Sequence, residues 1–315
     1  MKSTEFFSLK FDGLSIKYAV GNRKEAIVIA RGLGEPTAEE DERLIEIFNQ
    51  VGYTVLIPHY GGSWDSRYGE RKFMDGSDNS ALSAEKDITD VINALADGKA
   101  AVSSHKEILL VGNSFGAPIA LMAGAKLDYV KKIVSIGGGI CSPHNKYKDR
   151  AAMMFNILDK DRDDPNKPWG RNGKNYLGFN LKFTLGFVDG IPANPYDYID
   201  RLATKDIFLV HVKRDRHLLS QRSIDFSKKI EECCRDKGIA SRARLEIVDY
   251  IINPGNRNTV ANHGTAEATS GFYRKLFQFL DPEIDMSRVA CVVREVNSKY
   301  LKLPRQIRES YGLLE

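Results

Sequence analysis

The chain contains few of the residues that mark a specialised class of protein. Only four of its 315 residues are cysteine, Cys233 and Cys234 are adjacent, and no pair has CxxC or zinc-type spacing. We therefore expect neither a disulfide framework nor a metal site. No apolar run reaches the roughly 18 residues of a membrane span, and residues 1–9 lack the apolar segment of a signal peptide. The expected setting is the cytoplasm, with no membrane partner.

A strong surplus of one charge is also missing. Lys and Arg number 46 against 42 Asp and Glu, and both signs are interspersed, which argues against nucleic acid as a partner. The glycine clusters at 61–62 and 137–139 are not followed by Lys-Ser or Lys-Thr and do not fit GxGxxG. A nucleotide site is therefore not expected, and no cofactor is implied.

Instead, the chain alternates short apolar runs with amphipathic segments. Strands are predicted at 26–30, 53–57, 108–111, 130–136, 207–212 and 244–248, with Pro58 ending the second. Helices are predicted at 37–51, 88–95, 223–237 and 266–280, and after Gly116. Asp12-Gly13 predicts a hairpin between the runs 6–11 and 14–20. This order predicts an α/β fold with a mostly parallel central sheet, an antiparallel start and helices on both faces.

The alternation suggests where the units of the chain lie. It fails between 141 and 203, where Lys, Asp, Asn and Pro are frequent, and resumes afterwards. We expect a core formed by 1–140 and 204–281, a lid or cap insertion at 141–203, and a C-terminal helical extension at 282–315. The extension is basic and amphipathic, which favours packing on the domain or a homo-oligomer contact over a membrane-surface helix.

The strongest chemical signal is Gly112-x-Ser114-x-Gly116, placed between a predicted buried strand and a predicted helix. A serine hydroxyl becomes a nucleophile when a base removes its proton and a sharp turn exposes it. Flanking glycines remove the Cβ atoms that would clash in such a turn. The alternative is a tight strand-to-helix turn without chemistry.

With this motif, residues 26–280 resemble the α/β-hydrolase family. The resemblance implies a catalytic triad in the order Ser, acid, His. Asp215, just after the strand at 207–212, takes the acid position, and His263, before the last helix of the sheet region, takes the base position. His263 would accept the Ser114 proton and return it to the leaving group, while Asp215 would orient the imidazole and stabilise its charged form.

Each of these two assignments has an alternative. Asp215 could be a solvated surface charge, and His263 could cap the following helix. Asp189 and Asp206 are the other acids considered, but Asp206 precedes its strand and should lie at the wrong end of the sheet. The remaining histidines are weaker candidates, and His211, inside a predicted strand, is expected to be a packed or hydrogen-bonded core residue.

The resemblance also implies an oxyanion hole, with the backbone amides of Phe115 and Leu33 as donors. Two departures from the family pattern bear on its support. Arg31 stands where the family has the histidine of a His-Gly loop. After the strand at 53–57 the chain has Pro58-His59-Tyr60 where similar proteins have Pro-Asp-x-Arg-Gly, so the bracing of the site must differ here.

These residues together predict a serine hydrolase acting on a small-molecule acyl substrate. The reaction would be cleavage of a carboxylic ester or related acyl bond through an acyl-enzyme intermediate. A peptidase or amidase, or an acyltransferase or thioesterase, is the alternative on the same scaffold. A non-catalytic binding protein that keeps the fold is the alternative of another class. The identity of the substrate depends on the lid, where the sequence is least informative.

Overall fold

An eight-stranded sheet is the centre of the computed structural model, over the residues that it describes. These are residues 3–12, 14–32, 38–59, 81–99, 105, 107–114, 116–138, 140, 195–213, 220–248 and 270–300. The strands are β1 (Phe7–Phe11), β2 (Leu14–Ala19), β3 (Glu25–Ala30), β4 (Thr54–His59), β5 (Glu107–Asn113), β6 (Val130–Ile136), β7 (Asp206–Val212) and β8 (Ala243–Val248). Their order in the sheet is β1-β2-β4-β3-β5-β6-β7-β8. β2 runs antiparallel to β1 and β4, and the other neighbouring pairs are parallel, which confirms the predicted sheet.

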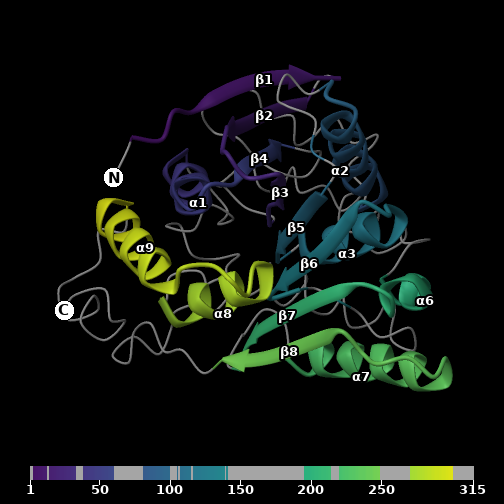
Figure 1. Ribbon diagram of the computed structural model, residues 1–315. Coiled ribbons are helices and arrows are strands. Elements are labelled where there is room, and N and C mark those ends of the chain that lie inside the picture. The colour runs from purple at the N-terminus through teal and green to yellow at the C-terminus, as the bar shows by residue number, and fades with distance from the viewer. Residues whose placement is uncertain are drawn as a thin grey trace, which may run out of the picture.

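Helices cover both faces of the sheet (Figure 1). They are α1 (Ala38–Gln50), α2 (Ala81–Ala96), α3 (Gly116–Lys126), the short η3 (Pro195–Tyr198) and α6 (Ile199–Leu202), α7 (Gln221–Asp236), α8 (Ser270–Leu280) and α9 (Met286–Tyr300). α2, α3, α6 and α7 enclose one hydrophobic core, and α1, α8 and α9 enclose the other. None of these described helices is long and apolar enough to cross a membrane.

Strand β3 shows why an uninterrupted apolar run predicts a strand of a buried parallel sheet. Ala26, Val28 and Ala30 point into the first core, while Ile27 and Ile29 point into the second. Because successive side chains of a strand alternate between the faces, a strand covered on both sides must be apolar throughout. The apolar run at 26–30 therefore correctly predicted a strand that is buried on both faces of the sheet.

The predicted end of β4 was wrong. Pro58 was expected to stop the strand, yet β4 continues to His59, and Pro58 pairs with Ile16 of β2. The parallel ladder with β3 extends only to the pair of Val28 and Leu56. Beyond that point β4 is paired on one side only, and a strand paired on one side tolerates a residue without an N–H.

The initial hairpin follows the sequence closely. Phe11 pairs with Leu14, so β1 and β2 are joined by a two-residue turn. Asp12 has φ +46, the left-handed conformation that a type I′ turn requires.

The expected lid and extension are described in part. Residues 141–194 and 301–315 lie outside the described residues. The last residues of the expected lid form η3 and α6, where Ile199 and Leu202 join the core beside α3. Within the extension, α9 packs on α1, with Arg43 Nη1 donating to Asn297 Oδ1 at 3.1 Å.

The path of the chain places a topological switch point between β3 and β5. From β3 the chain passes through α1 to β4 on one side, whereas β5, on the other side of β3, continues through α3 to β6. In open α/β sheets, ligands bind beyond the carboxyl ends of the strands at such a switch point. Ala30 and Gly112 face each other there, and Ser114 follows two residues later.

Candidate active site

Ser114 occupies a strained turn at the carboxyl end of β5. Its φ is +54, in the left-handed region that a non-glycine residue adopts only when its surroundings impose it. Its N–H donates to the carbonyl oxygen of Ile136 at the end of β6, at 2.8 Å. The side chain is half-buried. The turn therefore fixes a partly accessible hydroxyl at the sheet edge.

Glycines at 112 and 116 make this turn sterically feasible. A Cβ atom at Gly112 would overlap the carbonyl oxygen of Gly116, and one at Gly116 would overlap the carbonyl oxygen of Ala30. Both overlaps are with backbone, which cannot move aside as a flexible side chain can. The placement of GxSxG between a buried strand and a helix is thereby confirmed, and the steric reason for its glycines is the close packing of α3 on β3.

Gly32 brings a second backbone segment against the serine. A Cβ atom at Gly32 would lie 2.9 Å from Ser114 Cβ and 3.5 Å from Ser114 Oγ. The backbone at Gly32 therefore lies directly beside the hydroxyl, where an oxyanion donor has to be held. Leu33 and Phe115, the two donors expected from the sequence, lie outside the described residues.

The acid and base candidates, Asp215 and His263, also lie outside the described residues. The elements that precede them are described. β7 ends at Val212 and β8 ends at Val248, and both strands run parallel to their neighbours in the half of the sheet that holds β5. In chain order, both candidates thus follow strands that end at the same edge as β5.

Two other polar residues considered from the sequence, His211 and Asp206, lie inside the core or away from this edge, and Asp189 lies outside the described residues. His211 is fully buried in β7, and its Nδ1 lies 2.8 Å from Ser223 Oγ, as expected for a hydrogen-bonded core residue. Asp206 is the first residue of β7 and forms an ion pair with Arg242, Nε to Oδ1 at 2.6 Å. It lies at the amino end of its strand, as predicted.

A buried cluster of charged and polar side chains was missed. Asp41, near the start of α1, is fully buried, with Oδ1 3.2 Å from Arg31 Nε and Oδ2 3.7 Å from His59 Nε2. Its signal in the sequence was an acid in register with Leu44, Ile45 and Phe48, the apolar face of the predicted helix. Arg31 and His59 had been noted as departures, but nothing local connected them.

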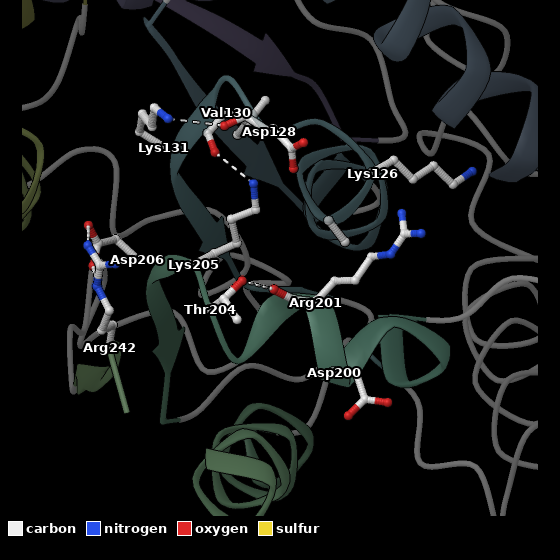
Figure 2. Close-up of a pocket in the computed structure, with 11 residues that line it drawn as sticks. Lys126, Asp128, Val130, Lys131, Asp200, Arg201, Thr204, Lys205, Asp206 and Arg242 are labelled. Atoms are coloured by element: carbon white, nitrogen blue, oxygen red, sulfur yellow. Dashed lines mark hydrogen bonds and ion pairs between the residues drawn. The ribbon is translucent and has the colours of Figure 1, made fainter. Parts of the chain in front are cut away.

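A cavity of about 670 Å³ opens at the other edge of the sheet (Figure 2). It lies near the first residues of β6 and β7, where several cations are already engaged. Lys205 Nζ donates to the carbonyl oxygens of Leu127 and Val130, at 2.8 and 3.1 Å. Burial lowers the pKa of this lysine. Because the cavity is at the amino edge, it cannot present a substrate to Ser114.

Several solved structures share this architecture. An esterase of Pyrococcus furiosus is 16% identical, with a TM-score of 0.55 over 95% of this chain and 92% of that chain. The α/β hydrolase GrgF of Penicillium sp. sh18 is 14% identical, with a TM-score of 0.58 over 90% and 99%. The acylaminoacyl peptidase of Pyrococcus horikoshii is 14% identical, with a TM-score of 0.54 over 91% of this chain and 43% of that chain.

At the level of sequence, no protein-family model and no curated protein matches the chain. Structural likeness at such low identity establishes the fold and leaves the reaction open. The chain has the α/β-hydrolase fold, as the sequence predicted.

Proposed function

We propose that the protein is a serine hydrolase that cleaves a carboxylic ester or related acyl bond of a small molecule. The observation that carries the proposal is the strained backbone of Ser114 at the switch point of the sheet. Backbone strain of this kind persists where the surrounding structure over-determines it, and it is concentrated at functional sites. A purely structural turn between β5 and α3 would not need a left-handed serine.

In the proposed mechanism, Ser114 Oγ attacks the acyl carbon while His263 accepts its proton. The oxyanion forms hydrogen bonds to the amides of Phe115 and Leu33. Collapse of this intermediate expels the leaving group, protonated by His263, and leaves an acyl-enzyme. Water, activated by the same histidine, then releases the acid and restores the serine. Asp215 orients the imidazole and stabilises its charged form. The cycle needs no cofactor.

Support for an ester substrate comes from the structural neighbours, which include esterases. A peptidase is the second candidate, because an acylaminoacyl peptidase shares the fold. Comparing p-nitrophenyl esters of increasing acyl length with aminoacyl anilides separates the two.

We also propose that residues 141–203 form the lid that sets substrate preference. We also propose a cytoplasmic setting, which the low cysteine content of the sequence favours.

The decisive experiment replaces the nucleophile. Ser114→Ala is expected to lower kcat/KM for p-nitrophenyl esters by roughly 10³-fold or more and to abolish covalent labelling by a fluorophosphonate. Ser223→Ala is the matched control, because that serine also contacts a histidine but is buried in the core. Labelling of Ser114→Ala at the wild-type level would refute the proposal. His263→Ala and Asp215→Asn, with turnover lowered and folding kept, would test the remaining assignments.

A further inference from the structure

The cluster of Arg31, Asp41 and His59 joins structural elements that meet at the carboxyl edge of the sheet. Arg31 directly follows β3, His59 ends β4, and Asp41 lies on α1. The two oxygens of the Asp41 carboxylate face different partners, Arg31 on one side and His59 on the other. The exposed fractions of the side chains are 8%, 0% and 6% in the order Arg31, Asp41, His59. One carboxylate thus connects the ends of two neighbouring strands.

This connection lies where the strand pairing has stopped. The parallel ladder between β3 and β4 ends at the pair of Val28 and Leu56. The ladder between β3 and β5, by contrast, continues to the pair of Ala30 and Gly112. The end of β3 is therefore held by backbone hydrogen bonds on its β5 side, and on its β4 side the contact with the Asp41 carboxylate takes their place.

Stability alone is a poor explanation for such a cluster. Removing ions from water costs several kcal/mol each, and apolar residues of similar volume often give an equally or more stable protein. The next residue of α1 shows a different arrangement, because the carboxylate of Glu42 is 32% exposed, although its partner Lys17 is only 6% exposed. A fully buried carboxylate is better explained by a requirement that Arg31 and His59 be held in fixed positions.

The position that depends on Arg31 is the turn beside the candidate nucleophile. Gly32 follows Arg31 directly, and an added Cβ there would lie 2.9 Å from Ser114 Cβ. The main-chain oxygen of Arg31 also faces the start of α3, 2.7 Å from where a Cβ of Gly116 would be. Arg31 is thus held on one side by Asp41 and on the other by the turn that contains Ser114.

We propose that Arg31, Asp41 and His59 are positioning residues that hold the turn after β3 at the distance from Ser114 that oxyanion stabilisation requires. The proposal rests on the proposed serine-hydrolase function. It also gives the two departures from the family pattern a joint role, since both are partners of the same carboxylate. A misplacement of about 1 Å at a reacting centre can lower a rate about 100-fold, so a small loosening has a measurable effect.

The test removes both charges of the main pair together. The double variant Arg31→Gln, Asp41→Asn keeps polar side chains at both positions, and neither charge of this ion pair is left without the other. The matched control is Lys17→Gln, Glu42→Gln, which neutralises the neighbouring ion pair of α1 away from the turn. For each protein, kcat and KM for a p-nitrophenyl ester, the Ki of a trifluoromethyl ketone and the Tm are measured. The ketone forms a hemiketal with the serine, whose oxyanion needs the same donors.

We expect the Arg31 and Asp41 double variant to lower kcat about 10- to 100-fold, with KM within about threefold. The Ki of the ketone should rise by the same factor as kcat/KM falls. The control should keep wild-type kcat and Ki even if its Tm falls by a similar amount. Equal kcat and Ki in the double variant and the control would overturn the proposal.

Two further measurements keep the result interpretable. If the double variant does not fold, His59→Gln, which changes the longer contact, should still lower kcat and raise the ketone Ki together, and wild-type values for both would overturn the proposal. Ser114→Ala is assayed in parallel. Wild-type turnover by Ser114→Ala would refute the proposed function itself, whereas loss of turnover there, with the double variant matching the control, would refute only the positioning role.

Discussion

The two edges of the sheet are built on different principles. At the carboxyl edge, Ser114 is held in a strained conformation, and glycines allow backbone segments to approach more closely than any side chain would permit. At the amino edge, long cationic side chains bind backbone carbonyls. Lys132 Nζ, for example, donates to the carbonyl oxygens of Phe279 and Leu280 at 2.7 and 2.9 Å. The comparison suggests that one edge is shaped for chemistry and the other for anchoring.

Anchoring at the amino edge also includes the segment that follows α8. Arg23 Nη1 donates to Asp281 Oδ2 at 2.7 Å, Arg23 Nε donates to the Val51 carbonyl oxygen at 3.2 Å, and the guanidinium lies 4.7 Å from the centre of the Tyr53 ring. Together with Lys132, these contacts fix the carboxyl end of α8. That helix follows the segment containing His263, so the anchored edge also restrains the chain that leads away from the candidate base.

The largest effect is expected when the carboxyl edge is disturbed directly. Gly116→Ala places a Cβ against the carbonyl oxygen of Ala30 and must separate α3 from β3. We expect a loss of about 1–3 kcal/mol in the free energy of unfolding and a fall in ester turnover of at least about 100-fold. Urea unfolding and a p-nitrophenyl ester assay measure both.

Its control is Gly238→Ala, at a glycine that, unlike Gly116, has a positive φ of +65 and has no atom within 4 Å of an added Cβ. This variant should lose about 1 kcal/mol from backbone strain and keep full turnover. Wild-type turnover and stability in Gly116→Ala would contradict the steric account of the carboxyl edge.

A smaller, pH-dependent effect is expected from Asp281→Asn at the amino edge. Partial burial opposes ionisation of Asp281, but the hydrogen bonds from Arg23 and from the backbone N–H of Glu283, together with the charges of Arg23 and Lys132, lower its pKa below the ordinary 3.8. A depressed folded-state pKa stabilises the protein above the unfolded-state value and ceases to do so as the pH falls through the folded-state value. The variant should therefore be less stable by about 1–2 kcal/mol at neutral pH, and the gap should narrow below pH 3.8.

Urea unfolding of wild type and Asp281→Asn at several acidic and neutral pH values measures this gap. Ester turnover at neutral pH should remain within about twofold of wild type, because the substitution is at the anchoring edge. A stability gap that does not change with pH would show that the carboxylate charge is not what stabilises this edge.

The smallest effect is expected at Lys205, beside the cavity of the amino edge. Lys205→Met removes two hydrogen bonds to backbone carbonyls but also relieves the burial of an ammonium whose pKa is lowered by that burial. These terms oppose each other, so the loss of unfolding free energy should be below about 1.5 kcal/mol, with unchanged ester turnover. Lys131→Met, at an exposed lysine of the same cavity, is the control. Loss of turnover in Lys205→Met alone would contradict the assignment of this edge to anchoring.

Most of the fold could be predicted because its signals are local. Strand β3 contains the continuous apolar run 26–30. Strand β6 was predicted with the boundaries that it has, Val130 to Ile136. The end of β4 was not predictable, because tolerance of Pro58 depends on which neighbour is paired at that point, a property of the assembled sheet. Residues 141–194 lack the alternation of the core, with only a short helical pattern near 153–158, and they lie outside the described residues.

In the candidate site, too, the residues with local sequence signals were predicted and those that depend on contacts between distant elements were not. Ser114 was found because strand, turn and helix are contiguous in sequence, and the turn around it is as predicted. Asp41 was not found, because its role arises only when α1, β3 and β4 meet in space. Asp215 and His263 stay predictions from the family resemblance, since the segments that contain them have no pattern beyond their place in the chain.

The left-handed turn at Ser114 also limits which amino acids this scaffold could use as a nucleophile. A β-branched side chain is a steric outlier at φ +54, so threonine, although it carries the same hydroxyl group, is disfavoured there before reactivity is considered. Cysteine has no second substituent on Cβ and is compatible with the turn. The backbone geometry therefore favours cysteine over threonine as a replacement for Ser114. An evolved or engineered change of nucleophile at this position would be expected to introduce a thiol.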